Sequence, residues 1–199
     1  SDSTRNALVE SIAYWKKDQV VPKEIEAQLP AMELVLALTV KYSALVMNPP
    51  YMGSSNMNPT LTKYIKCNYE EGKADLFSVF MILCIDRLEK KGKYGMINMQ
   101  SWMFFTVFED LRNTILDNYS LESLLHLGPH TFDELSGEFV QNCAFIITYE
   151  KPNKSTIFYR LTDGVNSNHK CQLFLSHENT RIYRTDYRKF NNVPGRPLC

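Results

Sequence analysis

A short apolar run that stops at two consecutive prolines constrains the fold more than any other feature. Residues 43–47 are mostly apolar, and Asn48, Pro49, Pro50 and Tyr51 follow them directly. Such a run is typical of a buried central strand, and proline cannot continue a strand inside a sheet. We therefore expect a strand that ends in a rigid loop, with Asn48 to Tyr51 at its carboxyl end.

Helical and strand-like patterns alternate up to about residue 150. Residues 22–39 have helical spacing, and Pro30 within them predicts a kink or two short helices. Asp75 can cap a second helix, over residues 75–90, which Gly92 is expected to end. The remaining predicted elements are a loop over 51–70 with one helical turn at 61–65, strands at 94–99, 121–127 and 142–149, and a helix around 107–115.

This order predicts an α/β sheet with crossover helices that ends in an antiparallel hairpin. After residue 151 the pattern weakens, and the short runs 156–161 and 171–175 suggest a small separate β element or a linker. Residues 181–189 interleave basic side chains with tyrosines. Such a stretch either contacts phosphates or, more commonly, forms a solvated strand edge.

Composition excludes several classes of protein. The 22 basic and 22 acidic residues balance, so charge alone gives no sign of nucleic-acid binding. No apolar run is long enough to cross a bilayer, and the first residues lack a secretory signal, which makes a cytoplasmic location the expectation. Five widely spaced cysteines without a Cys-x-x-Cys pair predict reduced thiols and neither disulfides nor a zinc site.

The residues after the first strand suit one particular reaction. Ligands bind at the carboxyl ends of strands in open α/β sheets. The amino group of adenine is a poor nucleophile, and two acceptors beneath its hydrogens would localise its lone pair. The Asn48 side-chain oxygen and the Pro49 carbonyl can accept those hydrogens, while Tyr51 offers a face on which an extruded base stacks. The alternative is a simple turn, since Asn and Pro are common turn residues.

Longer stretches carry a family resemblance. They are residues 45–58 (Leu-Val-Met-Asn-Pro-Pro-Tyr-Met-Gly-Ser-Ser-Asn-Met-Asn), 73–77 (Lys-Ala-Asp-Leu-Phe), 95–104 (Gly-Met-Ile-Asn-Met-Gln-Ser-Trp-Met-Phe), 126–134, 137–145, 183–184 and 193–197. Together they resemble the PglX methyltransferases of BREX phage-defence systems and, more loosely, the Eco57I-like methylases of restriction systems. The resemblance implies adenine-N6 methylation of double-stranded DNA with S-adenosylmethionine. It assigns the base-holding loop to Asn48, Pro49, Pro50 and Tyr51, and the aromatic on the other face of the base to Phe145.

One part of the family pattern is absent. No Gly-rich motif of the type that cradles the cofactor precedes Asn48. We therefore expect the second half of a Rossmann-like methyltransferase sheet over residues 1–150, with Asn48 as its partial contribution to cofactor binding. Residues 151–199 are expected to be a linker or the start of a target-recognition region. The open sheet edge favours pairing of two copies as a homodimer, and the fragment alone is expected to be inactive.

Two other functions remain open. The same loop geometry suits methylation of a protein glutamine at N5, and a half-sheet without a cofactor loop suits a scaffold that other defence subunits or phage inhibitor proteins bind. His126 and His130 are not expected to hold a metal, and Asp133, Glu134 and Glu138 are expected to form a solvated loop. Three residues after a strand either contact DNA or pack: Gln100, Ser101 and Trp102.

Overall fold

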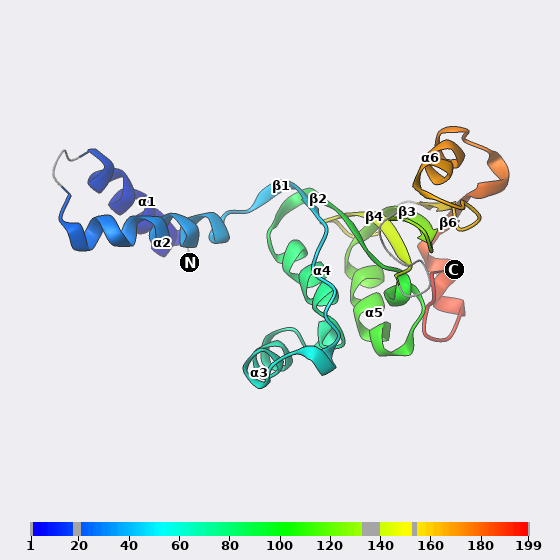
Figure 1. Ribbon diagram of the computed structural model, residues 1–199, viewed down its shortest axis with the longest axis horizontal. Coiled ribbons are helices and arrows are strands. Elements are labelled where there is room, and N and C mark those ends of the chain that lie inside the picture. Colours follow the sequence, from blue (N-terminus) through cyan, green and yellow to red (C-terminus); the bar gives the residue numbers. More distant parts are fainter. Residues whose placement is uncertain (1, 18–20, 133–139, 153–154, 199) are drawn as a thin grey trace. The chain divides into compact units, whose positions relative to one another are not determined.

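Two units make up the chain, Ser1–Tyr42 and Ser43–Cys199. The computed structural model describes residues 2–17, 21–132, 140–152 and 155–198. In the first unit, helices α1 (Asp2–Lys17) and α2 (Lys23–Thr39) lie side by side (Figure 1), and Lys16 pairs with Glu33. Pro30 lies inside one continuous α2, so the alternative of two short helices is wrong.

The second unit is built on one six-stranded sheet with the order β1-β2-β4-β3-β5-β6. The strands are β1 (Tyr42–Met47), β2 (Leu88–Met99), β3 (Ser120–Gly128), β4 (Asn142–Thr148), β5 (Ser155–Arg160) and β6 (Ile182–Asp186). β4 lies between β2 and β3 and runs antiparallel to both. The predicted α/β class and the antiparallel pair at the end of the alternating pattern are therefore confirmed.

β1 differs from the expectation of a buried central strand. It lies at one edge of the sheet, and most of its residues are exposed, with Val46 at 90%. An apolar run indicates that a strand is buried in the complete fold, but it does not indicate which chain segment buries it. Within the described residues, β1 has only β2 as a neighbour.

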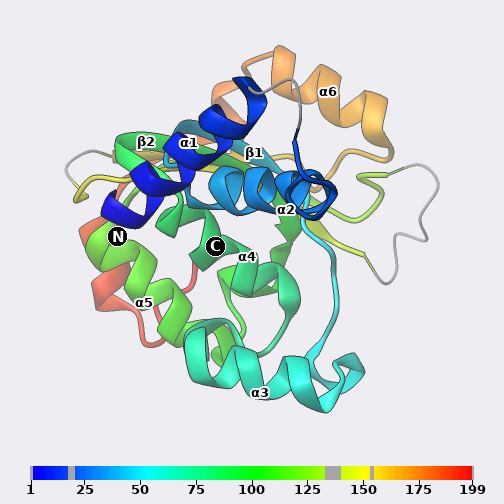
Figure 2. The same ribbon diagram turned by 90° about the vertical axis from the view of Figure 1, so that its left-hand side faces the viewer.

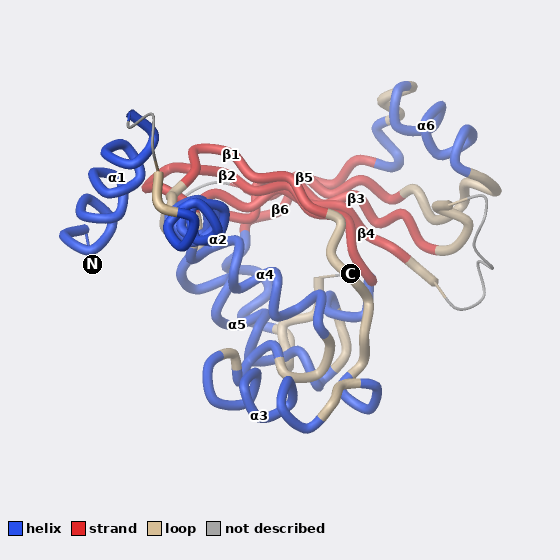
Figure 3. Tube along the Cα trace, turned by 60° about the vertical axis from the view of Figure 1, so that its left-hand side comes forward, coloured by secondary structure: helices blue, strands red, loops and turns tan. Residues whose placement is uncertain are grey.

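Helices α4 (Leu76–Asp86) and α5 (Glu109–Asn118) cover one face of the sheet, with α3 (Pro59–Asn68) beyond them (Figure 3). α6 (Ser167–Leu175) lies on the other face, where Phe174 contacts Tyr159 with ring centroids 5.1 Å apart. The core between the sheet and α4 and α5 consists of apolar side chains that are almost completely buried. Among them are Phe77, Met81, Leu111, Ile115, Tyr94, Leu124, Phe145 and Ile147.

Two boundaries differ from the sequence prediction. The turn expected at 61–65 is the middle of the longer α3, which Asn58 caps by accepting from the Leu61 amide at 2.8 Å. α4 ends at Asp86, so Gly92 lies inside the long strand β2 and does not end a helix. The first residues of β2 are mostly charged and exposed, and for this reason they look like the end of a helix in the sequence. Pairing of β2 with β4 begins only at Lys93.

The residues after 151 extend the same sheet. β5 pairs parallel with β3, and β6 pairs antiparallel with β5. Figure 2 shows α6 on the opposite side of the strands from α3, α4 and α5. The predicted run 156–161 is thus a strand, whereas the run 171–175 lies in α6. Across the described ranges, none of the helices combines the length and the apolar character that a membrane span requires.

Candidate active site

The loop from Asn48 to Tyr51 leaves the sheet at the carboxyl end of β1 and stays at the surface. Asn48 and Pro50 are exposed, Pro49 is buried and Tyr51 is half-buried. In the part of the chain that the structure describes, no hydrogen bond uses the Pro49 carbonyl. The loop therefore presents a side-chain amide to solvent beside a main-chain carbonyl that has no partner among the described residues, while its second residue anchors it in the fold.

The Tyr51 side chain is fixed at three points. Its hydroxyl accepts a hydrogen bond from Asn142 Nδ2 at 3.1 Å and donates one to Asn48 Oδ1 at 3.3 Å. Its ring contacts Phe77 edge to face, with centroids 6.3 Å apart. Burial, helped by the nearby Cys143 thiol, raises the pKa of Tyr51 to about 12. The phenol is consequently protonated at neutral pH and remains a donor to Asn48.

Asp75 ties this loop to α4. Asp75 Oδ1 accepts from the Phe77 amide at 3.2 Å, which caps the helix as predicted, and from the Met52 amide at 3.0 Å. The Leu76 amide donates to the Met52 carbonyl, and Gly53 forms a β-bridge with Asp75. One carboxylate therefore holds both the start of α4 and the residue that follows Tyr51.

A row of polar side chains continues along the same edge of the sheet. Gln100, just after β2, donates through Nε2 to Gln141 Oε1, and its own Oε1 lies 2.7 Å from His126 Nε2 at the end of β3. Burial, followed by the charges of Arg160 and Lys170, lowers the pKa of His126 from its usual value. A neutral His126 with its proton on Nε2 donates to Gln100, so the three side chains form one hydrogen-bonded rim.

Phe145 and Trp102 are enclosed in the core. Phe145 is 2% exposed, and its ring meets those of Trp102 and Tyr94 edge to face at 5.0 and 5.9 Å. This position leaves almost no ring surface on which a base could stack. Trp102 is fully buried and donates to Cys143 Sγ, so it has the packing role and not the DNA contact.

The polar residues singled out after β3 are spread out. Gln100 and His126 share the rim, whereas His130 lies in the turn after β3 with a φ of 56°. Asp133, Glu134 and Glu138 lie outside the described residues. The sequence prediction missed two contributors to the loop: Asn142, an asparagine that opens an apolar strand, and the second hydrogen bond of Asp75.

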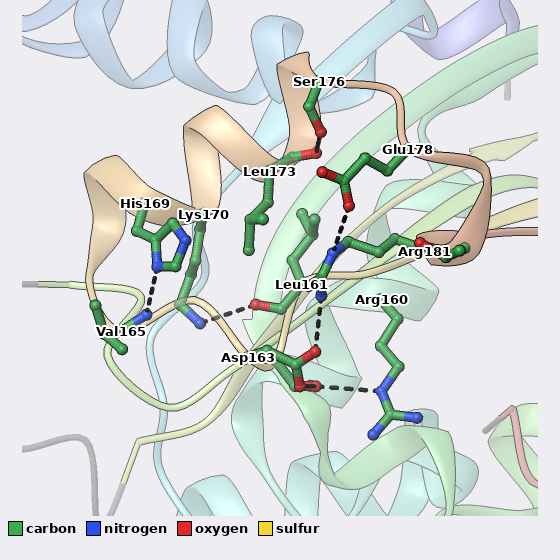
Figure 4. Close-up of polar contacts among 12 residues, drawn as sticks. Arg160, Leu161, Asp163, Val165, His169, Lys170, Leu173, Ser176, Glu178 and Arg181 are labelled. Carbon is green, nitrogen blue, oxygen red and sulfur yellow. Dashed lines mark hydrogen bonds and ion pairs between the residues drawn. The ribbon is translucent and has the colours of Figure 1, made fainter.

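Two of the basic residues in 181–189 are engaged by carboxylates of this chain. Arg181 pairs with Asp163 at 2.7 Å and with Glu178 at 3.3 Å (Figure 4), and Arg188 pairs with Asp186. In the same region the buried Lys170 donates to the carbonyls of Leu127 and Leu161 (the second bond is drawn in Figure 4). These contacts favour a structural role for Arg181, since a phosphate would have to displace two carboxylates from it.

Comparison with known proteins identifies the family of this chain. The model of the family described as Eco57I restriction-modification methylase matches residues 4–132. The chain belongs to this family. It is 38% identical over 182 residues to the adenine-specific methyltransferase BrxX of Escherichia coli O9:H4 (strain HS), covering 89% of this chain and 15% of that protein.

A second relative supports the same family, and a solved structure has the same fold. The adenine-specific methyltransferase PglX of Lacticaseibacillus casei (strain Zhang) is 36% identical over 168 residues, which is 82% of this chain and 14% of that protein. A solved structure of a type I restriction-modification system aligns with a TM-score of 0.64 at 14% identity, covering 96% of this chain and 51% of that chain. The resemblance to PglX and Eco57I-like methylases is therefore confirmed, and the chain spans about one seventh of its curated relatives.

Proposed function

We propose that this chain is the acceptor-binding part of the catalytic domain of a DNA methyltransferase that modifies adenine at N6. The observation that carries the proposal is the exposed Asn48 amide, held next to the Pro49 carbonyl at the carboxyl end of β1. The relatives are named as adenine-specific methyltransferases, and the family is one of restriction-modification methylases. The substrate would be an adenine flipped out of duplex DNA.

The chemistry follows from two acceptors and one ring. Asn48 Oδ1 and the Pro49 carbonyl each accept one hydrogen of the adenine amino group, which turns its lone pair toward the methyl donor. Tyr51 stacks on the base and replaces part of the stacking lost on flipping, worth about 1–3 kcal/mol. No separate strong base is needed for the attack, because the methylated nitrogen is cationic and strongly acidic and releases its extra proton to solvent.

S-adenosylmethionine would supply the methyl group as an electrophilic sulfonium methyl. The described residues include no glycine-rich loop of the kind that cradles this cofactor, so they do not fit it as a complete site. We propose that the cradle is formed by a segment outside this chain. Calorimetry tests this: the chain alone should bind S-adenosylmethionine weakly, whereas a longer protein that includes the family's glycine-rich motif should bind it. If the longer protein also fails to bind, a scaffold role is favoured instead.

The outer edge of β1 has no neighbouring strand within the described sheet. Unpaired strand edges readily pair with further chain. We propose that either more of the same sheet or a second copy of the chain pairs there. Sedimentation of the chain at increasing concentration distinguishes the two, because only a homodimer gives a concentration-dependent mass.

Methyl transfer by the full-length enzyme is the main test. Asn48→Ala should lower methyl incorporation into adenine of duplex DNA about 100- to 1000-fold, since it removes one preorganised group at the reacting centre. Asn48→Asp is the matched control, because it keeps an acceptor oxygen at the same position and should lose less. Unchanged DNA methylation in Asn48→Ala would refute the mechanism. Incorporation into glutamine of a protein substrate instead of DNA would favour the alternative methyltransferase class.

A further inference from the structure

Asn142 is a fully buried polar residue at the first position of β4, where it faces the loop from Asn48 to Tyr51. Its Nδ2 donates to the Tyr51 hydroxyl at 3.1 Å and to the Asn98 carbonyl at 3.2 Å. Its exposure is 0%. The second bond seats the amide on β2, and the first directs it at the candidate active site.

The other half of this amide is unsatisfied. Asn142 Oδ1 is buried and has no hydrogen-bond partner among the described residues. A buried acceptor without a partner destabilises a fold, and an apolar side chain at this position would avoid that loss. Stability alone therefore does not explain an asparagine here, while its donor group has a definite target.

The target of the Asn142 donor is the Tyr51 hydroxyl, which has a single proton of its own to donate. Because the Tyr51 oxygen accepts from Asn142, its own proton is free to point at Asn48 Oδ1, 3.3 Å away. Without the Asn142 donor, the Tyr51 oxygen is equally able to accept from the amide nitrogen of Asn48. That exchange would rotate the Asn48 carboxamide and place its nitrogen where its oxygen now lies.

We propose that Asn142 is a positioning residue for methyl transfer: through the Tyr51 hydroxyl it fixes the orientation of the Asn48 carboxamide, so that Oδ1 is presented to the substrate amine. The inference rests on the proposed function, since it assigns Asn48 Oδ1 to that amine. An amide oxygen has two lone pairs, so Asn48 Oδ1 can accept from Tyr51 and from the substrate together. The raised pKa of Tyr51 keeps the bridging proton in place throughout the neutral range.

The test is a double-mutant cycle in the full-length enzyme with Asn142→Leu and Tyr51→Phe. Leu fills a similar volume without a donor, and Phe keeps the stacking ring without the hydroxyl. Each single variant should lower kcat about 10-fold, and the double variant should be no worse than Tyr51→Phe alone, because both changes remove the same bridge. KM for DNA should change less than about two-fold, since groups that contact the bound base in both states are retained.

A spectroscopic readout separates positioning from loss of structure. Fluorescence of 2-aminopurine at the target position should report normal base flipping in Asn142→Leu, because the Tyr51 ring is retained. Cys143→Ala is the matched control for core damage: Cys143 is buried beside Asn142 and donates to Asn98 Oδ1, but it makes no hydrogen bond to Tyr51. It should lower the melting temperature and leave kcat unchanged.

Three results would overturn the inference alone while the wild-type enzyme methylates DNA. They are a wild-type kcat in Asn142→Leu, an equal further loss of kcat when Asn142→Leu is added to Tyr51→Phe, and a matching loss of kcat in Cys143→Ala. If the wild-type enzyme does not methylate DNA adenine at all, the proposed function fails first and the inference fails with it.

Discussion

Asp75 offers a direct test of how the fold holds the loop that presents Asn48. Among the described residues, Asp75 Oδ1 is the only side-chain cap of α4, and it accepts from the Phe77 amide at 3.2 Å. The same oxygen accepts from the Met52 amide at 3.0 Å. Loss of a helix cap costs about 1 kcal/mol, and a hydrogen bond to a charged acceptor contributes about 1.5–3 kcal/mol. Asp75→Ala should therefore lower the free energy of unfolding by about 2.5–4 kcal/mol.

Asp75→Asn is the matched control. It keeps an acceptor oxygen for both amides and loses only the charge at the helix start, which is worth at most about 1 kcal/mol. Urea unfolding followed by the fluorescence of Trp102, which is fully buried in the same unit, measures both variants. Equal destabilisation by Ala and Asn would refute the reasoning, because the two hydrogen bonds would then contribute nothing beyond the charge.

Three further predictions concern an arginine, two cysteines and a histidine of the second unit. Arg112→Met removes four hydrogen bonds to main-chain carbonyls and should lower the free energy of unfolding by about 3–5 kcal/mol. Arg112→Lys should lower it less, and thermal unfolding measures both variants. The exposed Cys171 should react with a thiol reagent in the native protein, whereas Cys143, whose pKa burial raises to about 12, should react only on unfolding, as mass spectrometry would show. The lowered pKa of His126 means that its contribution to stability is complete above pH 6.5 and is lost as pH falls through the folded-state value. NMR titration should give a pKa below 6.5 that rises in Arg160→Gln; a value at or above 6.5 contradicts this.

Elements whose signals are local were predictable. Asp75 as a cap, the strand before Asn48 and the antiparallel β3 and β4 all follow from apolar runs, caps and turn residues close to one another in sequence. The edge position of β1 did not follow, because it depends on which strands are its neighbours. The length of α3 was underestimated because Asn58 and Pro59, a cap and a first helical residue, also occur in turns.

The buried position of Phe145 shows a second kind of limit. Along β4, Cys143, Phe145 and Ile147 face the core under α4 and α5, while Ala144 and Ile146 are more exposed. Alternation in a strand tells which residues share a face, but not which face the helices cover. The partnership of Asn142 with Tyr51 was equally hidden, since 91 residues separate them and both look ordinary locally.

The antiparallel insertion of β4 is what brings these distant groups together. A strand that runs antiparallel to its neighbours begins at the side of the sheet where the neighbouring strands have their carboxyl ends. β4 pairs Asn142 with Met99 at the end of β2 and with Gly128 at the end of β3, so its first residues lie at the edge where those strands finish. Gln141 and Asn142 therefore lie beside Gln100, and Asn142 reaches Tyr51 after β1. A β4 parallel to β2 would place Thr148 at this edge, and neither the rim nor the bridge to Asn48 could form.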